Sequence, residues 1–230
     1  MFLASFPTGH WQANCYVVAA PGEADCVVID AGEEAAPSVR QVLTEHQLRP
    51  KGVLATHGHF DHVACAAEIA DEYNVPLWIH SADRDLLTEP AAGLGPDGAA
   101  LVKQLLRTPM VEPARVEEFD GLTELNIARL RFSVTHAPGH TEGSVLLGLD
   151  YTGRNTQINR IVFSGDVVFA GSVGRTDLPG GDPRTMSRTL RDAVLPLPDT
   201  VALLPGHGPQ TTMAHERATN PYLQPAAVEI

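Results

Sequence analysis

The chain has 230 residues, 43% of them hydrophobic, and a formal net charge of −12. Length and composition are those of a globular protein with a large core, and they exclude extensive disorder. The acidic balance argues against nucleic-acid binding, which depends on a basic face. No apolar stretch approaches the 18 residues that a membrane-spanning helix needs, so we expect no membrane partner either.

The cysteines indicate the compartment. Cys15, Cys26 and Cys65 form no CxxC pair. A sparse, odd set of thiols is typical of a reduced, cytoplasmic protein. The first residues lack the Lys or Arg of a secretory leader, which agrees with a cytoplasmic location. The sequence leaves the state of assembly open between monomer and homodimer.

The first half of the chain alternates strand and helix signals. Apolar and β-branched runs predict strands, and apolar residues at helical spacing predict helices. The strands are expected at residues 2–6, 15–19, 26–30, 52–55 and 76–80, and the helices at 36–46 and 63–73. Residues 90–113 begin rich in Pro and Gly and predict a surface loop with a short helix at 99–107. This excursion is either a surface insertion or a lid over a site.

The second half repeats this style. Strands are expected at residues 122–127, 130–135, 144–149, 161–164 and 201–204. One helix has clear ends, because Asp182 can cap its start, Pro183 fits its first turn and Pro196 stops it. No linker or repeat divides the chain, so residues 1–230 are expected to form a single α+β domain in which helices cover sheets.

The most informative feature is the run from His57 to His62, which reads His-Gly-His-Phe-Asp-His. His57 and His59 are two residues apart at the end of a strand, so both imidazoles point to the same side and can reach one metal. Asp61 and His62 stand where a helix begins, and the turn aims them differently, which indicates a second metal nearby. Imidazole and carboxylate ligands suit zinc, iron or manganese.

Three later motifs extend the ligand set. His140, Asp166 and His207 each follow a glycine, and each lies close behind an apolar strand. Glycine permits backbone angles that other residues avoid, so the side chain after it can project off a sheet edge. Together with the cluster, these motifs predict a binuclear metal site built from seven side chains.

The ordered ligand set resembles that of the dinuclear members of the metallo-β-lactamase superfamily, over nearly the whole chain. The resemblance implies a four-layer αββα sandwich with the metals at the strand ends. It also assigns each ligand to a metal: His57, His59 and His140 to the first, Asp61, His62 and His207 to the second, and Asp166 to both. Asp30 matches a family aspartate that supports the ligating imidazoles from behind.

Residues 164–182 and 204–223 are similar to short bacterial relatives of glyoxalase II, the hydroxyacylglutathione hydrolases. This implies hydrolysis of a small-molecule thioester, S-lactoylglutathione or a related thiol conjugate. Two divalent metal ions would bring the pKa of a shared water from 15.7 toward about 7. Asp166 and Asp61 are the expected catalytic carboxylates, the first holding the metal spacing and the second orienting the hydroxide. Zinc is the expected metal, with iron and manganese as alternatives.

A second reading of the same ligands is a persulfide (sulfur) dioxygenase, an oxidoreductase. That branch holds a single iron by the equivalents of His57, His140 and Asp166. Lactone hydrolysis and a non-catalytic metal-binding module are further alternatives. The Gly-His-Gly motif at His207 and the glyoxalase-like segments favour hydrolysis of a thioester.

Several other side chains are predicted near the site. His136 lies four residues before His140 and is expected to pack there or to orient a ligand. Arg175 and Arg217 are candidates for pairing with a substrate carboxylate. Tyr222 and His80 are further candidates for lining the substrate pocket.

Overall fold

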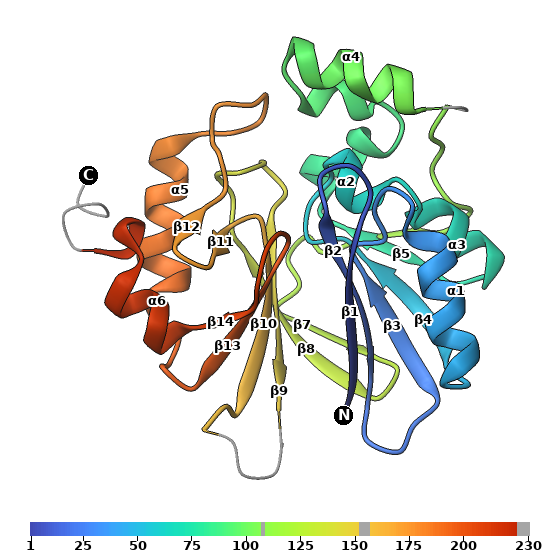
Figure 1. Ribbon diagram of the computed structural model, residues 1–230, viewed down its shortest axis with the longest axis horizontal. Helices are drawn as coiled ribbons and strands as arrows, with labels where there is room; N and C mark the ends of the chain where they lie inside the picture. Colours follow the sequence, from blue (N-terminus) through green and yellow to red (C-terminus); the bar gives the residue numbers. More distant parts are fainter. Residues whose placement is uncertain (107–108, 152–156, 225–230) are drawn as a thin grey trace.

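Two six-stranded sheets face each other in the computed structural model, which describes residues 1–106, 109–151 and 157–224 (Figure 1). The first sheet follows chain order: β1 (Phe2–Thr8), β2 (Ala13–Ala19), β3 (Asp25–Ile29), β4 (Arg49–Leu54), β5 (Leu77–Ile79) and β6 (Val116–Glu118). The strands β1 to β3 pair antiparallel, and β3 to β6 pair parallel.

The second sheet runs in the order β14 (Thr211–Thr212), β13 (Val201–Pro205), β10 (Arg160–Gly165), β9 (Val145–Asp150), β8 (Leu130–His136) and β7 (Glu124–Ile127). Only its β10–β13 pair is parallel in the part of the chain described. A small hairpin of β11 (Val168–Phe169) and β12 (Ser172–Val173) follows β10.

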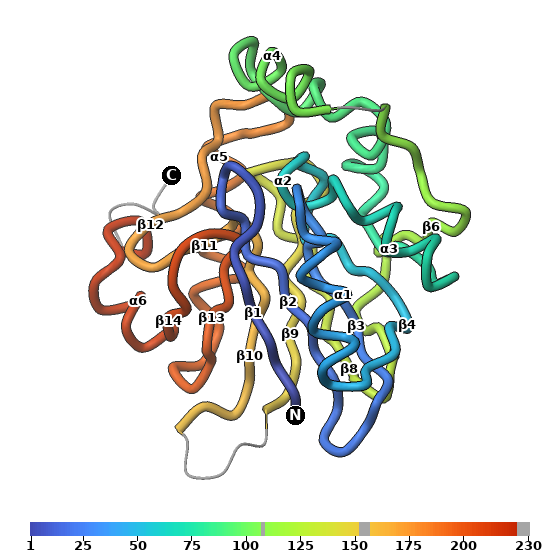
Figure 2. The backbone as a smooth tube through the Cα atoms, turned by 45° about the vertical axis from the view of Figure 1, so that its right-hand side comes forward, coloured from blue at the N-terminus to red at the C-terminus, as the bar shows by residue number. Residues whose placement is uncertain are grey.

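Helices cover the outer faces of both sheets (Figures 1 and 2). The first sheet carries α1 (Ala35–Glu45), the single turn α2 (Phe60–Val63) and α3 (Ala66–Glu72). The second carries α5 (Pro183–Thr189), continued as a π-helix at Leu190–Val194, and α6 (Met213–Thr219) is close by. Beyond these layers lies α4 (Pro96–Leu105), which follows the 3₁₀ turns Ser81–Leu87 and Pro90–Gly93. Another 3₁₀ turn spans Pro221–Leu223.

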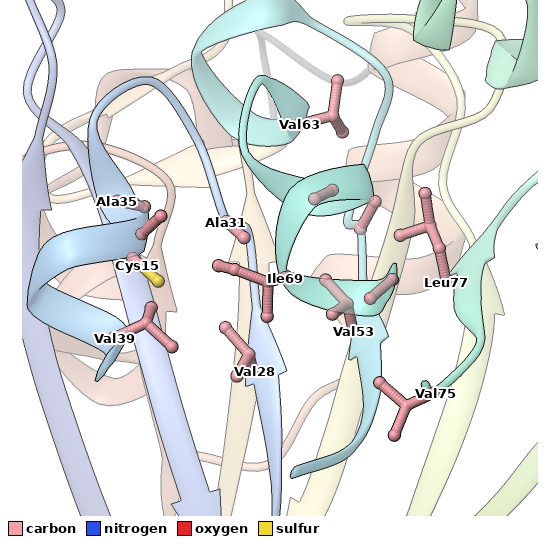
Figure 3. Packing of buried hydrophobic residues seen from close by; sticks show 14 of the residues in the cluster. Cys15, Val28, Ala31, Ala35, Val39, Val53, Val63, Ile69, Val75 and Leu77 are labelled. Atoms are coloured by element: carbon pink, nitrogen blue, oxygen red, sulfur yellow. The ribbon is translucent and has the colours of Figure 1, made fainter. Parts of the chain in front are cut away.

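Three buried clusters correspond to the three interfaces of a four-layer sandwich. Strand β2 shows how the sequence builds two of them: Cys15 and Val17 pack against α1 and α3, whereas Tyr16 and Val18 face the second sheet. This alternation follows from the two-residue period of a strand. Figure 3 shows the outer cluster, where Val39 of α1 and other apolar side chains meet the sheet. The expected αββα architecture is therefore confirmed.

The helix predicted at 63–73 is wrong in one respect, because the chain forms two helices there. The Cys65 amide donates to the Ala31 carbonyl at 2.9 Å, outside the helix, and this breaks the ladder between α2 and α3. The strand β6 was not predicted, since Glu117 and Glu118 make it look like a loop. Charged side chains are common on an edge strand, where they discourage further pairing.

The excursion at 90–113 carries a helix as expected, although α4 begins earlier, at Pro96. Residues 107 and 108 lie outside the described residues. Figures 1 and 2 place α4 beyond the end of the sandwich where α2 lies. None of the helices in the described ranges has the length and apolar character that crossing a bilayer requires.

Candidate metal centre

The seven predicted ligands converge at one end of the sandwich. His57, His140, Asp166 and His207 follow the ends of strands β4, β8, β10 and β13. His59 directly precedes α2, and α2 supplies Asp61 and His62. Within the described residues, three groups have ligand atoms within 4.8 Å of one another: His57, His59 and His140; His57, His62 and Asp166; Asp61, His62 and His207. The first and third groups have the membership that the resemblance implies for two metals.

The separations between ligand atoms match a metal polyhedron. Metal–ligand bonds of about 2.1 Å at tetrahedral angles put ligand atoms about 3.4 Å apart. His59 Nδ1 lies 2.9 Å from His140 Nε2, and His62 Nε2 lies 3.3 Å from His207 Nε2. His207 Nε2 is 3.1 Å from Asp61 Oδ2. Both groups are therefore close enough for each to share one ion.

Asp166 lies between the two groups. Its Oδ2 is 3.5 Å from both His140 Nε2 and His207 Nε2, and its Oδ1 is 3.5 Å from His62 Nε2. A carboxylate in this position contacts members of both ligand groups. This is the geometry that a bridging ligand requires.

Asp30 orients two of the imidazoles from behind, as the sequence predicts. It is buried, and its Oδ2 accepts a hydrogen bond from His62 Nδ1 at 3.1 Å and from Thr56 Oγ1 at 2.8 Å. Because the Thr56 hydroxyl is engaged as a donor, it accepts from His57 Nδ1 at 3.1 Å. Both rings thus turn Nε2 toward the centre, with their tautomer set by the partner of the other nitrogen.

Main-chain carbonyls orient two more ligands. His140 Nδ1 donates to the Arg175 carbonyl at 2.8 Å, and His207 Nδ1 donates to the Trp11 carbonyl at 3.0 Å. In both rings Nε2 is then free to face the centre. Sequence analysis missed the role of Trp11, and no signal points to it, because any residue type supplies a carbonyl.

The first ligand group is electrically neutral. Burial lowers the pKa of His57 well below its ordinary value, and burial together with neighbouring histidines lowers the pKa of His59 to about 4. Burial likewise lowers the pKa of His140 to about 4. Neutral imidazoles offer lone pairs, which is the form that binds a metal.

The third group, Asp61, His62 and His207, combines histidines with a carboxylate, and Asp166 lies beside it. Burial opposes a charge on His62, yet Asp61 and Asp166 raise its pKa to about 10. Burial likewise opposes ionisation of Asp61, but His62 and His207 hold the pKa of this carboxyl well below its usual range. Burial raises the pKa of Asp166. The buried carboxylates are therefore stabilised by positive charge nearby. A divalent cation supplies that charge in place of the imidazole protons.

Unsatisfied atoms also fit a bound cation. His57 Nε2 and Asp166 Oδ1 are buried and have no hydrogen-bond partner. A buried polar atom without a partner costs about 1–3 kcal/mol. Both atoms belong to the group of His57, His62 and Asp166, so one cation can contact both. The residues present therefore fit a divalent metal.

Glycines make room for the centre, but for two different reasons. Gly139 and Gly165 have φ values of +137° and +46°, as expected for glycine before a ligand. Gly206 does not have a positive φ, so the backbone-angle explanation is wrong there. A Cβ on Gly206 would lie 2.1 Å from Asp166 Oδ1, so this glycine is required by space.

Asp83 is a positioning residue that sequence analysis missed. This buried carboxylate accepts from the Gly58 amide at 2.8 Å and from the Thr141 hydroxyl and the Gly143 amide at 2.7 Å each. It thereby ties the loop that carries His57 and His59 to the loop that carries His140. Its sequence context, Ser-Ala-Asp-Arg-Asp, reads as a solvated helix surface, which explains the omission.

The structure places two predicted histidines away from the ligands. His80 and His136 stack on each other at 4.2 Å, beside a separate cavity. His136 is exposed, and its Nε2 donates to the Glu142 carbonyl at 2.8 Å. The expectation that His136 orients a ligand and that His80 lines the metal pocket is wrong. Strand β8 ends at His136, and only the loop beyond it turns His140 inward.

Of the other predicted contacts, only Arg175 reaches the pocket. Its guanidinium pairs with Asp177 at 2.7 and 2.8 Å. Arg217 instead donates to the Asp199 carboxylate and to two main-chain carbonyls near the end of the π-helix. Tyr222 is 48% exposed and is not part of the pocket wall. The predicted substrate roles of Arg217 and Tyr222 are therefore wrong.

A cavity of about 430 Å³ opens over the metal centre. Five of the seven ligands line it, together with the start of α4 and the side chains of Trp11 and Phe60. A larger hollow of about 840 Å³ lies between α1, α3 and residues 104–106 and 109–111, and none of the seven ligands lines it. The chemistry therefore belongs to the smaller cavity, and α4 forms part of its wall.

A buried His and Asp cluster at the strand ends of an αββα sandwich defines a metal-dependent hydrolase superfamily. The family model described as the metallo-beta-lactamase superfamily matches residues 8–207, and the chain belongs to this superfamily.

Individual relatives differ in the activity that they are named for. The hydroxyacylglutathione hydrolase GloC of Haemophilus influenzae is 31% identical over 97% of this chain and 98% of its own. The crystal structure of the B3 metallo-beta-lactamase BLEG-1 has a TM-score of 0.80 at 32% identity, covering 96% of this chain and 99% of that one. TTHA1623 in a di-iron-bound form has a TM-score of 0.74 at 33% identity, covering 96% and 100%.

Proposed function

We propose that this protein is a dinuclear metal-dependent thioester hydrolase of the glyoxalase II type. The observation that supports this most is the pair of ligand groups with Asp166 between them. The similarity to GloC, which is named a hydroxyacylglutathione hydrolase, agrees with thioester chemistry. Thioesters of low-molecular-weight thiols are the substrate class that follows, with S-lactoylglutathione as the reference compound for assay.

In this proposal, His57, His59 and His140 would hold one ion, Asp61, His62 and His207 would hold the other, and Asp166 would be a ligand to both. Bound divalent metals supply a nucleophilic hydroxide near neutral pH and stabilise developing negative charge on oxygen. Zinc, iron and manganese all suit these ligands, and the di-iron form of TTHA1623 makes iron a specific candidate.

Side chains around the centre hold the ligands in position. Asp30 fixes the ring of His62 directly and that of His57 through Thr56, while Asp61 lines the cavity and can accept a hydrogen bond from a nucleophile on the substrate side. A thiolate leaving group has a pKa near about 8.5, so it departs without a strong general acid. This agrees with a cavity wall whose ionisable groups, beyond the ligands, are Asp97 and Arg175 in the described residues.

The test combines metal analysis with three assays on the same sample. The protein is loaded with zinc, iron or manganese, and its metal content is measured per chain. It is then assayed with S-lactoylglutathione, with a chromogenic β-lactam, and with glutathione persulfide in an oxygen electrode. Thioester cleavage that scales with two metals per chain is the expected result. Oxygen uptake with the persulfide, or β-lactam cleavage without thioester cleavage, would replace the proposal.

Asp166→Asn tests the bridging role. The amide cannot supply two anionic oxygens, so we expect loss of at least one metal per chain and loss of turnover by at least about a hundredfold. Asp150→Asn is the matched control, because the Asp150 side chain is 80% exposed and pairs with Arg160 on the surface. Full turnover by Asp166→Asn with a single metal would exclude a bridging carboxylate.

A further inference from the structure

Beyond the metal ligands, most of the residues that line the cavity over the metal centre are apolar. Beyond the metal ligands, its large side chains are Trp11, Phe60, Leu94, Pro96 and Leu178. Trp11 and Phe60 meet edge to face at 6.0 Å, and Leu178 lies beside Gly95, 3.8 Å from where a Cβ on that glycine would be. These residues come from the β1–β2 turn, α2, the start of α4 and the loop before α5, so an aliphatic group in the cavity would be enclosed from several sides.

The charges on this wall do not suit a carboxylate-rich ligand. In the described ranges the wall carries one carboxylate, Asp97, and one guanidinium, Arg175, besides the ligands. The guanidinium already holds Asp177 through two hydrogen bonds. A substrate carboxylate could bind Arg175 only by replacing the Asp177 carboxylate. Replacing one carboxylate by another in an exposed ion pair gains little binding free energy.

Glutathione presents two carboxylates, and among the described residues the cavity wall offers no cation besides Arg175. Arg217, the other arginine that the sequence offered for this purpose, is held by Asp199 and by two main-chain carbonyls. Asp97 would in addition repel a carboxylate that entered past the start of α4. The cavity therefore favours uncharged, apolar groups on both sides of the scissile bond.

Resting on the proposed thioester hydrolase function, we infer that the preferred substrate is a thioester with an apolar acyl chain and a thiol that carries no carboxylate. The acyl chain lies against Trp11, Phe60 and Leu178, while the carbonyl faces the metal ligands. Each methylene that enters such a wall is expected to raise kcat/KM about fourfold until the cavity is filled.

The experiment uses the metal-loaded protein and two matched series of thioesters. Acetyl, butanoyl and hexanoyl groups are carried either on N-acetylcysteamine, which is uncharged, or on glutathione. We expect kcat/KM to rise with chain length in both series, and to be about tenfold or more lower on glutathione for the same acyl group, because its carboxylates lose solvation without gaining a cation. The inference would be overturned if kcat/KM for the glutathione thioesters, or for S-lactoylglutathione, equalled or exceeded that for the N-acetylcysteamine thioesters, or if kcat/KM did not depend on chain length. Either result would leave the thioesterase proposal standing.

Two further measurements separate the outcomes. Leu178→Ala is expected to reduce kcat/KM for the hexanoyl ester about tenfold more than for the acetyl ester. Val111→Ala, at a side chain that is 61% exposed and outside the cavity, should leave the chain-length dependence unchanged. If Leu178→Ala and Val111→Ala had the same effect on the chain-length dependence of kcat/KM, Leu178 would not contact the acyl chain and the inference would be contradicted.

Binding provides a readout that does not depend on turnover. Titration calorimetry of the S-hexyl thioethers of N-acetylcysteamine and of glutathione should show tighter binding of the uncharged compound. Tighter binding of the glutathione thioether would refute the inference. If no thioester of either series is cleaved by protein that holds two metals per chain, the proposed function fails and this inference fails with it.

Discussion

Replacing Gly206 by alanine tests whether close packing of the backbone holds the metal ligands in place. A Cβ there would lie 2.1 Å from Asp166 Oδ1 and 2.7 Å from His62 Cε1. The backbone cannot retreat easily, because the Gly206 amide donates to the Gly165 carbonyl at 2.8 Å and its carbonyl accepts from the Asn14 amide at 2.7 Å. The two ligand side chains must therefore move.

The size of the movement sets the expected effect. Relieving the contact to the 3.0 Å that real Cβ atoms keep requires a shift of about 0.9 Å, mostly of Asp166. Metal–ligand distances tolerate about 0.2 Å. Disturbing the partners of a ligand already costs 10- to 100-fold in metal affinity, so displacement of a ligand itself should cost at least about a hundredfold, or about 2.8 kcal/mol.

The assay is a competition for metal against a chelator of known affinity, with metal content read by mass spectrometry and folding by circular dichroism. Gly52→Ala is the matched control, since a Cβ there would lie 2.6 Å from the flexible end of Ile127 and not from a ligand. We expect Gly206→Ala to stay folded and to lose metal, and Gly52→Ala to retain it. Metal affinity equal to the wild type in Gly206→Ala would refute the idea that this glycine makes room for the ligands.

Three further predictions concern Asp83, the buried histidines His59 and His140, and Arg217. Asp83→Asn replaces an oxygen acceptor by an amide that faces N–H donors. We therefore expect metal affinity, measured by the same chelator competition, to fall about 10- to 100-fold. Unchanged affinity would contradict the role of the Asp83 carboxylate in joining the two loops. In the metal-free protein, burial lowers the pKa of His59 and of His140 to about 4, so the unfolded chain binds more protons than the folded one between pH 6.5 and about 4. Each of these histidines should therefore remove up to about 3 kcal/mol of stability as the pH falls through that window. The raised pKa of Asp166 offsets part of this loss. A denaturation midpoint that stays constant from pH 6.5 to 4.5 would contradict this assignment. Arg217→Ala should lower the melting temperature without changing KM, since its guanidinium serves main-chain carbonyls, and a raised KM would return it to the substrate site.

Local sequence patterns were sufficient for most of the fold. Strand periodicity in residues such as Tyr16 and Val18 already distinguishes the two faces of β2, because a strand exposes alternate side chains to alternate layers. The break after α2 was not visible, because it depends on the Cys65 amide meeting the Ala31 carbonyl from another segment. Helical composition alone contains no information about that partner.

The sequence by itself determined which side chains can bind metal, since ligand chemistry resides in residue type and the spacing from His57 to His62 constrains their direction. The role of Asp30 came from the family resemblance, and its hydrogen bonds to His62 and Thr56 agree with that role. Only the tertiary structure decided which neighbours orient the ligands. Trp11 contributes a carbonyl, Asp83 joins two loops, and Gly206 contributes empty space. Such contacts depend on distances between segments that are remote in the chain, and residue type alone does not specify those distances.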